Sequence, residues 1–157
     1  MNIAIAPVQG EEDITHIRAL FSEYHEWLGV DLCFQGFQQE LKDLPGKYSE
    51  PRGTLTLARE GDAIAGCVGL WPLEERVCEM KRLYVRPAWR GRGLGRKLAL
   101  VIIDEAKKRG YQCMRLDTLP QLKEALGLYR SLGFVDTKPY YNNPLDGVSY
   151  LELALEA

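Results

Sequence analysis

One glycine-rich stretch, residues 81–98 with the sequence K-R-L-Y-V-R-P-A-W-R-G-R-G-L-G-R-K-L, constrains the fold more than any other part of the chain. Its first part, Lys81–Arg86, is rich in β-branched, aromatic and long aliphatic residues, which is typical of a strand. Pro87 ends that strand, because proline has no N–H group to give to a β-ladder. Residues 90–95 (R-G-R-G-L-G) then predict a turn, since glycine adopts backbone conformations that are closed to other residues. From Leu94 onward the apolar residues recur at helical spacing, so the stretch predicts a strand, a turn and a helix.

The start of this helix is predicted to bind an anion. Backbone N–H groups without an intrahelical partner point outward at a helix N-terminus, and the helix dipole favours negative charge there. Arg90, Arg92 and Arg96 add positive charge around the turn, and the glycines let a ligand approach the main chain. We therefore expect a phosphate or pyrophosphate site. The alternative is a glycine-rich turn that binds nothing.

Two common phosphate-binding motifs do not fit the turn. A P-loop needs four residues between its glycines and then Gly-Lys-Ser/Thr, which the stretch lacks. A dinucleotide-binding G-x-G-x-x-G fails because the third glycine position, counted from Gly91 and Gly93, is Arg96. The remaining pattern, R-G-x-G-x-G between an L-Y-V strand and a helix, resembles the acetyl-CoA signature of the GNAT superfamily, the GCN5-related N-acetyltransferases. The resemblance runs from about Thr54 to Phe134, and D-L-C-F-Q-G-F and L-P-G-K-Y look like segments of a bacterial and fungal subgroup of undefined substrate.

The resemblance implies that acetyl-CoA is the cosubstrate and that it binds along this stretch. In the GNAT fold the strand that carries L-Y-V diverges from its neighbour, so backbone groups near Leu83 and Val85 lack a ladder partner, and such groups are costly when buried. An amide or thioester carbonyl of the pantetheine arm would satisfy them, and the glycine turn would hold the pyrophosphate. The cofactor-binding residues implied in this way are Leu83, Tyr84, Val85, Arg90, Gly91, Arg92, Gly93, Leu94, Gly95 and Arg96.

The rest of the chain predicts a mixed α+β fold in one domain, residues 1–157. The order of strands and helices suggests a largely antiparallel sheet with helices on both faces, and Trp71–Glu75 is interpreted as a turn. The GNAT resemblance implies the same order, a central twisted sheet of about seven strands, and a V-shaped splay between strands 76–86 and 111–118 that holds the acyl-CoA. The expected strands are residues 2–8, 55–59, 64–70, 76–86, 111–118, 134–140 and 148–155, and the expected helices are residues 11–27, 31–44, 94–109 and 121–132.

Composition excludes several classes of protein. A net charge of −2 over 157 residues does not favour nucleic-acid binding, and no apolar run reaches membrane-spanning length. The N-terminus has neither the basic start nor the long apolar core of a signal peptide. Four cysteines lie far apart, without metal-ligand spacing. We therefore expect a cytoplasmic protein with buried free thiols, no metal, and no nucleic-acid or membrane partner.

Glu79 is the candidate general base. Strand 76–86 is expected to be central, yet it carries Glu79, Lys81 and Arg82, and charges in a core strand are costly unless they are paired or face a cleft. Strand alternation places Glu79, Lys81, Leu83 and Val85 on one side, if no bulge intervenes. GNAT enzymes that take a glutamate base from this strand have it at the matching position, so the resemblance implies that role. An ion pair with Lys81 or an arginine is the structural alternative.

Tyr129 is the candidate general acid. Its spacing alone predicts a core residue, on one helix face with Leu122, Ala125, Leu126 and Leu132. The pattern Y-x-x-x-G-F resembles the GNAT segment whose tyrosine hydroxyl meets the CoA sulfur, which implies that Tyr129 protonates the departing thiolate. Many family members carry Asn where this chain has Leu122, so that contact to the cofactor arm is absent or comes from another residue.

The acceptor side is less constrained. Phe34, Trp71, Asp117 and Tyr141 are candidates for lining the acceptor pocket, and each is equally plausible as a core or loop residue. We expect acetyl transfer from acetyl-CoA to the primary amine of a small molecule, by direct attack in a ternary complex. A non-catalytic acyl-CoA-binding or regulatory module is the main alternative, and a nucleotide-binding domain is a third. The resemblance also leaves room for a homodimer, since exposed final strands often pair in this superfamily.

Overall fold

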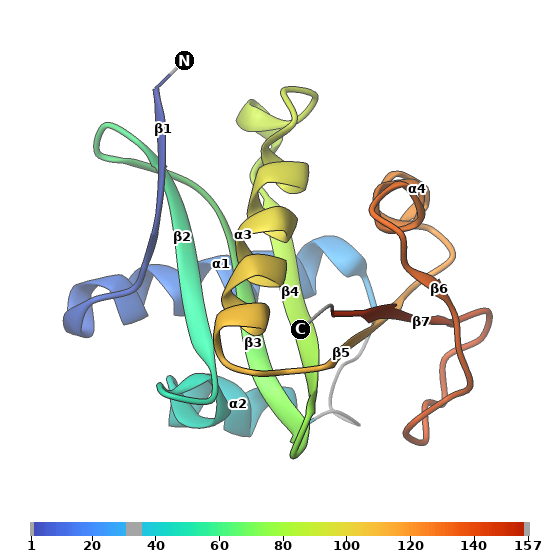
Figure 1. The fold of residues 1–157 in the computed structure, drawn as a ribbon. Helices are drawn as coiled ribbons and strands as arrows, with labels where there is room; N and C mark the ends of the chain where they lie inside the picture. Colours follow the sequence, from blue (N-terminus) through green and yellow to red (C-terminus); the bar gives the residue numbers. More distant parts are fainter. Residues whose placement is uncertain (1, 31–35, 156–157) are drawn as a thin grey trace.

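The computed structural model describes residues 2–30 and 36–155, which form the predicted order of strands and helices (Figure 1). The strands of the described residues join one seven-stranded sheet in the order β1-β2-β3-β4-β5-β7-β6. None of the helices in these residues is long and apolar enough to cross a membrane. The strands are β1 (Ile3–Pro7), β2 (Thr54–Glu60), β3 (Ala63–Glu74), β4 (Val77–Val85), β5 (Cys113–Thr118), β6 (Val135–Asp136) and β7 (Ser149–Ala154), and the helices are α1 (Gly10–Leu28), α2 (Phe37–Asp43), η2 (Gly46–Tyr48), η3 (Pro87–Trp89), α3 (Leu94–Lys108) and α4 (Lys123–Ser131).

The predicted V-shaped splay lies between β4 and β5. These two strands form the parallel pair of the sheet, and the other described strand pairs are antiparallel. Residues 77–79 of β4 pair with residues 113–115 of β5, and the ladder ends there. Figure 1 shows β4 continuing toward η3 while β5 and β7 turn away from it. The fold class is therefore confirmed as an α+β sheet, largely antiparallel, that opens between its fourth and fifth positions.

Helices cover both faces of the sheet, because each has one apolar face. The helix α3 buries Leu94, Leu98 and Ile102 against one face, and α4 joins it through Tyr129. On the other face, α1 buries a stripe at helical spacing that includes Ile17 and Phe21. Helix α2 lies on this second face as well, with its Phe37 side chain buried in the same cluster. Figure 1 shows α3 in front of β3 and β4, with α1 behind them.

A β-bulge on β4 overturns the expected alternation of its side chains. Arg82 has a positive φ of 58°, and Arg82 and Leu83 together lie opposite the single residue Val68 on β3. The extra residue reverses the side to which later side chains point. Leu83 and Val85 therefore pack on the α3 face, while Tyr84 joins the cluster under α1. The prediction that Leu83 and Val85 share a face with Glu79 and Lys81 was wrong, because backbone hydrogen bonding at the bulge overrides the simple period of two.

Three predicted boundaries also change. Trp71–Glu75 is not a turn: β3 continues to Glu74, with Trp71 opposite Glu79, and a register irregularity beside Pro72 accommodates the proline. The expected strand 134–140 shortens to Val135–Asp136, although the Thr137 N–H still donates to Tyr150 at 2.8 Å. Of the expected helix 31–44, the part within the described residues begins at Phe37.

Candidate active site

The glycine turn presents an uncapped helix N-terminus, as the sequence predicts. Gly93 is the N-cap of α3 with a φ of 79°, and no side chain caps the first turn. Gly91 also has a φ of 79°, and a Cβ at either glycine would meet open space. The positive φ explains why glycine is needed at these two positions. The first-turn N–H groups are thereby left for an anion.

The predicted arginines surround this turn at the surface. Arg90 lies over the ring of Trp27 at 4.6 Å and donates from Nε to the Val85 carbonyl at 2.8 Å. Arg96 donates to Ser131 Oγ on α4 at 2.9 Å, and Arg92 is exposed on the turn. Leu94 is fully buried, so the group that it could offer a cofactor is its backbone N–H.

The backbone of β4 offers a free edge beside the splay. The Arg86 N–H donates to Ala65 on β3 at 2.8 Å. Because successive residues of a strand direct their N–H groups to opposite edges, the Val85 N–H points toward the edge that β5 has left. The bulge moves the Tyr84 side chain under α1. These positions fit the expectation that Val85 meets a cofactor through its main chain.

A cavity of about 80 Å³ occupies the splay between β4 and β5. Leu83 and Lys81 reach it from β4, Asp117 and Thr118 from β5, and Tyr129 from α4. The Thr118 hydroxyl is buried and has no hydrogen-bond partner among the described residues. A buried polar group of this kind normally finds a partner. The cavity therefore holds polar groups that a ligand could satisfy. The full lining adds Tyr24, Trp27, Met80, Arg82, Leu116, Leu122 and Ala125.

Tyr129 lies at this cavity with its ring anchored in the core. The side chain is 7% exposed, and its ring packs edge-on against Phe134 at 5.8 Å. Burial raises the pKa of Tyr129 well above its usual range, so the hydroxyl is protonated at neutral pH. The two interpretations made from the sequence, a core residue and a proton donor, are compatible in this geometry.

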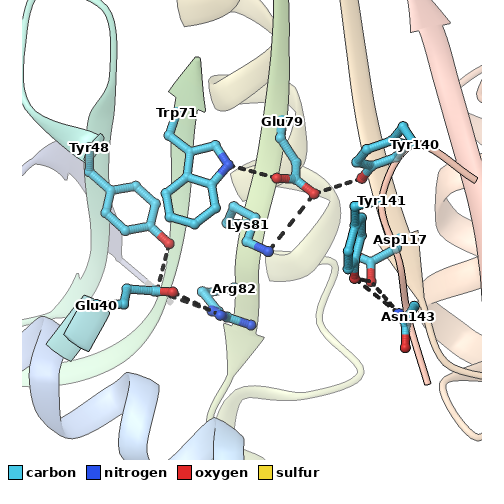
Figure 2. A network of polar contacts seen from close by, with 10 residues as sticks. All are labelled: Glu40, Tyr48, Trp71, Glu79, Lys81, Arg82, Asp117, Tyr140, Tyr141 and Asn143. Atoms are coloured by element: carbon cyan, nitrogen blue, oxygen red, sulfur yellow. Dashed lines mark hydrogen bonds and ion pairs between the residues drawn. The ribbon is translucent and has the colours of Figure 1, made fainter. Parts of the chain in front are cut away.

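Glu79 lies deeper than expected, in a closed hydrogen-bond network (Figure 2). It is 3% exposed, and it accepts hydrogen bonds from Trp71 Nε1 and from the Tyr140 hydroxyl, both at 2.6 Å. Lys81 Nζ lies 3.8 Å from its second oxygen. The structure thus brings Trp71 to Glu79 rather than into the cavity lining, and the predicted ion pair with Lys81 is present. Glu79 is itself outside that lining, as the described residues define it.

A second buried pair fixes the bulge. The Arg82 guanidinium donates to both oxygens of Glu40 on α2, at 2.8 and 3.2 Å, and the Tyr48 hydroxyl donates to the same carboxylate. Burial opposes the charged form of Glu40, yet the Arg82 contacts outweigh it and hold the pKa of Glu40 below its usual value. Arg82 also lines the cavity, and Glu40 offsets its positive charge.

Asp117 lies across the splay from Lys81, and the loop before β7 positions it. The Tyr141 hydroxyl and Asn143 Nδ2 both contact its Oδ2 atom, and Asn143 also holds Tyr141 at 3.0 Å. Both residues are candidates from the sequence for the acceptor pocket, and the structure brings them into contact. Asp117 lines the cavity, whereas Tyr141 supports it from behind.

Other parts of the predicted site fall elsewhere. Phe34 lies outside the described residues. Tyr24 and Trp27 also line the cavity, which was not predicted because their helical spacing on α1 indicates only core or surface positions. Lys81 was predicted only as a possible ion-pair partner of Glu79, not as a cavity residue. That charge in a central strand was the available signal for a polar cavity wall.

Comparison with known proteins identifies the family. The sequence model of the acetyltransferase (GNAT) family matches residues 14–134. The chain belongs to the GNAT family. An N-acetyltransferase of Schizosaccharomyces pombe is 43% identical over 98% of this chain and 96% of its own length. A second, from Dictyostelium discoideum, is 31% identical over 95% and 98%. The family prediction is therefore confirmed. Both relatives are described as uncharacterised, so their descriptions do not indicate an acceptor.

Solved structures share the fold. A GNAT family acetyltransferase from Elizabethkingia anophelis, solved with acetyl-CoA bound, has a TM-score of 0.67 at 20% identity and covers 98% of this chain and 99% of its own. At that identity the likeness shows the GNAT fold and no more. The predicted class of enzyme, an N-acetyltransferase, follows from the family match and the relatives.

Proposed function

We propose that this GNAT enzyme moves an acetyl group from acetyl-CoA to the primary amine of a small molecule, within a ternary complex. One observation carries the proposal: the polar cavity in the β4–β5 splay is lined by Tyr129 and by the part of β4 beyond its ladder with β5. The same strand leads through η3 to the uncapped start of α3. The acetyl-CoA bound to the Elizabethkingia anophelis relative supports the choice of cosubstrate.

In this mechanism the amine nitrogen attacks the thioester carbonyl, the N–C bond forms and the C–S bond breaks. The Val85 N–H, on the open edge of β4, donates to the developing oxyanion. The Tyr129 hydroxyl gives its proton to the leaving thiolate. The phosphates of the cosubstrate lie on the first turn of α3 between Arg90 and Arg96. The polar groups of the cavity then surround the reacting end of both substrates.

Glu79 is the proposed acceptor of the proton that the amine loses. Its carboxylate lies behind Lys81 and outside the cavity lining, so the proton travels through an intervening water rather than directly. Asp117 is the alternative base, because it lines the cavity and offers an oxygen on that side. The pH profiles of single variants, described in the Discussion, separate the two.

The test of the proposed function is release of CoA thiol from acetyl-CoA on a panel of primary amines, measured beside CoA binding and with product masses. Thiol release with a matching acetylated amine supports transfer. CoA binding without release on any amine would favour a non-catalytic acyl-CoA module. Binding of ATP or NAD without binding of CoA would favour a nucleotide-binding domain.

Two further expectations concern the cellular compartment and the oligomeric state. The described cysteines Cys67, Cys78 and Cys113 are free thiols, which supports a reducing, cytoplasmic setting. The two-residue strand β6 leaves a short sheet edge beside β7, which supports pairing of two copies there. Thiol titration of the unfolded protein and a solution mass measurement test these expectations.

A further inference from the structure

Two opposite charges face each other across the cavity. Lys81 comes from β4 and Asp117 from β5, the two arms of the splay, and both line the same cavity. The two charges attract each other, but Lys81 forms its ion pair with Glu79 and not with Asp117. Figure 2 shows the two side chains on opposite sides of this gap. The gap is therefore bounded by a cation and an anion that a ligand could bridge.

The Lys81 ammonium lacks hydrogen-bond acceptors. Lys81 is 5% exposed, and its nearest carboxylate oxygen, on Glu79, lies at 3.8 Å, beyond hydrogen-bond distance. Both Glu79 oxygens already accept bonds from Trp71 and Tyr140. Lys81 also lies over the Trp71 ring at 4.9 Å, which gives no acceptor oxygen. An ammonium carries three donors, and those of Lys81 are accessible in the cavity that this residue lines, where a ligand can accept from them. No described residue accepts a hydrogen bond from this group.

Asp117, in turn, has no positively charged partner among the described residues. Its contacts with Tyr141 and Asn143 both fall on Oδ2. No described cation lies within ion-pair distance of it, and the Arg82 guanidinium nearby is engaged by Glu40. Oδ1 therefore keeps its capacity to accept from a ligand. A positively charged group on the ligand is what this carboxylate lacks.

We propose that the acceptor is an α-amino acid or a close analogue, held with its carboxylate on Lys81 and its ammonium on Asp117; the inference rests on the proposed acetyl transfer. The ammonium gives one proton to Asp117 or to water before its neutral nitrogen attacks, and the second proton leaves as the amide forms. Arg82 offsets Glu40 and Lys81 offsets Glu79, which leaves Asp117 as the cavity carboxylate without a cationic partner among the described residues. The ammonium of a zwitterion balances Asp117, while its carboxylate accepts hydrogen bonds from Lys81. A simple amine would satisfy Asp117 alone and leave the Lys81 donors unpaired in the cavity.

The test compares amino acids with the amines that remain when their carboxylate is removed, such as phenylalanine with phenethylamine, tyrosine with tyramine and valine with isobutylamine. The readout is kcat/KM for thiol release, expressed as the ratio of amino acid to matched amine. The ratio does not depend on the fraction of active enzyme. One charge-assisted hydrogen bond to a carboxylate corresponds to a ratio on the order of 10 to 100. The amino acid amides, which keep the amine and remove the negative charge, should behave like the amines.

Lys81→Met should bring this ratio close to one. Lys47→Met is the matched control, because Lys47 lies over the same Trp71 ring at 4.8 Å but is exposed and outside the cavity lining. It should leave the ratio unchanged. Asp117→Asn should slow amino acids and amines alike, since both present an ammonium.

Two outcomes overturn the inference while the proposed function stands: wild-type enzyme that acetylates the amines and amides as well as the amino acids, or Lys81→Met with an unchanged ratio. The first comparison needs no variant, so it decides the question even if Lys81→Met fails to fold. Absence of thiol release on every amine and amino acid would instead remove the proposed function, and this inference with it.

Discussion

At the scale of single residues, Glu79 is held by hydrogen bonds from Trp71 and from the Tyr140 hydroxyl. Trp71 can only donate, whereas the Tyr140 hydroxyl can donate or accept. A glutamine at this position can therefore turn its oxygen to Trp71 and its amide to Tyr140. The substitution removes the proton acceptor and keeps these two hydrogen bonds, but it also takes the ion-pair partner from Lys81. A thermal scan of Glu79→Gln therefore accompanies its kinetics.

We predict that Glu79→Gln lowers turnover about a hundredfold or more, in line with typical general-base contributions. The loss should shrink as pH rises, because more of the acceptor amine is then neutral without help. Steady-state rates across pH for the variant and the wild type measure this. A variant that keeps the wild-type pH profile would make Glu79 a structural ion-pair partner, and Asp117→Asn would then be expected to show the predicted profile.

Tyr129→Phe removes the hydroxyl and keeps the ring packed on Phe134. We predict a clear fall in turnover with a change in unfolding free energy within about 1 kcal/mol, because the ring supplies most of the buried area. CoA binding should survive, since its proposed contacts are elsewhere. Rates, a thermal scan and CoA binding test this, and a variant that unfolds but keeps full activity in its folded fraction would make Tyr129 a core residue only.

At the scale of elements, the Glu40–Arg82 pair joins α2 to the bulge in β4. The elements themselves were predictable, because glycine turns, proline and apolar periodicity are local signals. The bulge was not predictable from local signals. Arg82 adopts its positive φ while it is paired with Glu40, which is distant from it in the sequence. Tyr140 likewise leaves the predicted strand 134–140 to reach Glu79, a contact that no local pattern encodes.

We predict that Glu40→Gln destabilises the protein by roughly 3–5 kcal/mol at pH 7, because it leaves the Arg82 charge buried without its partner. The folded-state pKa of Glu40 is lowered. The stabilisation that the Glu40 carboxylate gives the folded state is therefore complete above its pKa in the unfolded chain, about 4.3. This stabilisation is lost as the pH falls through the pKa of Glu40 in the folded state. Urea unfolding at several pH values should show the gap between wild type and variant narrowing below about pH 4.

The matched control is Asp104→Asn, which breaks the exposed pair with Lys108 on α3. Exposed pairs contribute about 0–1 kcal/mol, so this variant should differ little from the wild type at any pH. If Glu40→Gln changed the free energy of unfolding as little as Asp104→Asn, the Glu40–Arg82 ion pair would be dispensable for stability.

At the scale of the whole molecule, the order of elements predicted an α+β sheet, but it did not by itself determine which strands are neighbours. The divergence of β4 from β5 followed from the resemblance carried by the glycine turn, and the structure confirms it. The parallel pairing of these two strands was not predicted. The charges of the cavity were visible in the sequence as single residues. Their arrangement, with Lys81 on β4 and Asp117 on β5, depends on how the strands are placed in the folded sheet and could not be derived from spacing.

The proposed cosubstrate site can be tested on the whole fold by mass action. A ligand that binds only the folded state at a hundred times its dissociation constant stabilises it by about 2.7 kcal/mol, or roughly 5–10 °C in a protein of this size. We predict such a shift with CoA and with acetyl-CoA. Gly93→Asp should abolish it, because the added carboxylate repels the pyrophosphate from the first turn of α3. Gly93→Asn carries a side chain of the same shape at the same φ of 79° without the charge, so it should keep much of the shift. Equal losses in the two variants would mean that backbone geometry, not charge, is what the substitutions disturb, and an unchanged shift in Gly93→Asp would place the phosphates away from α3.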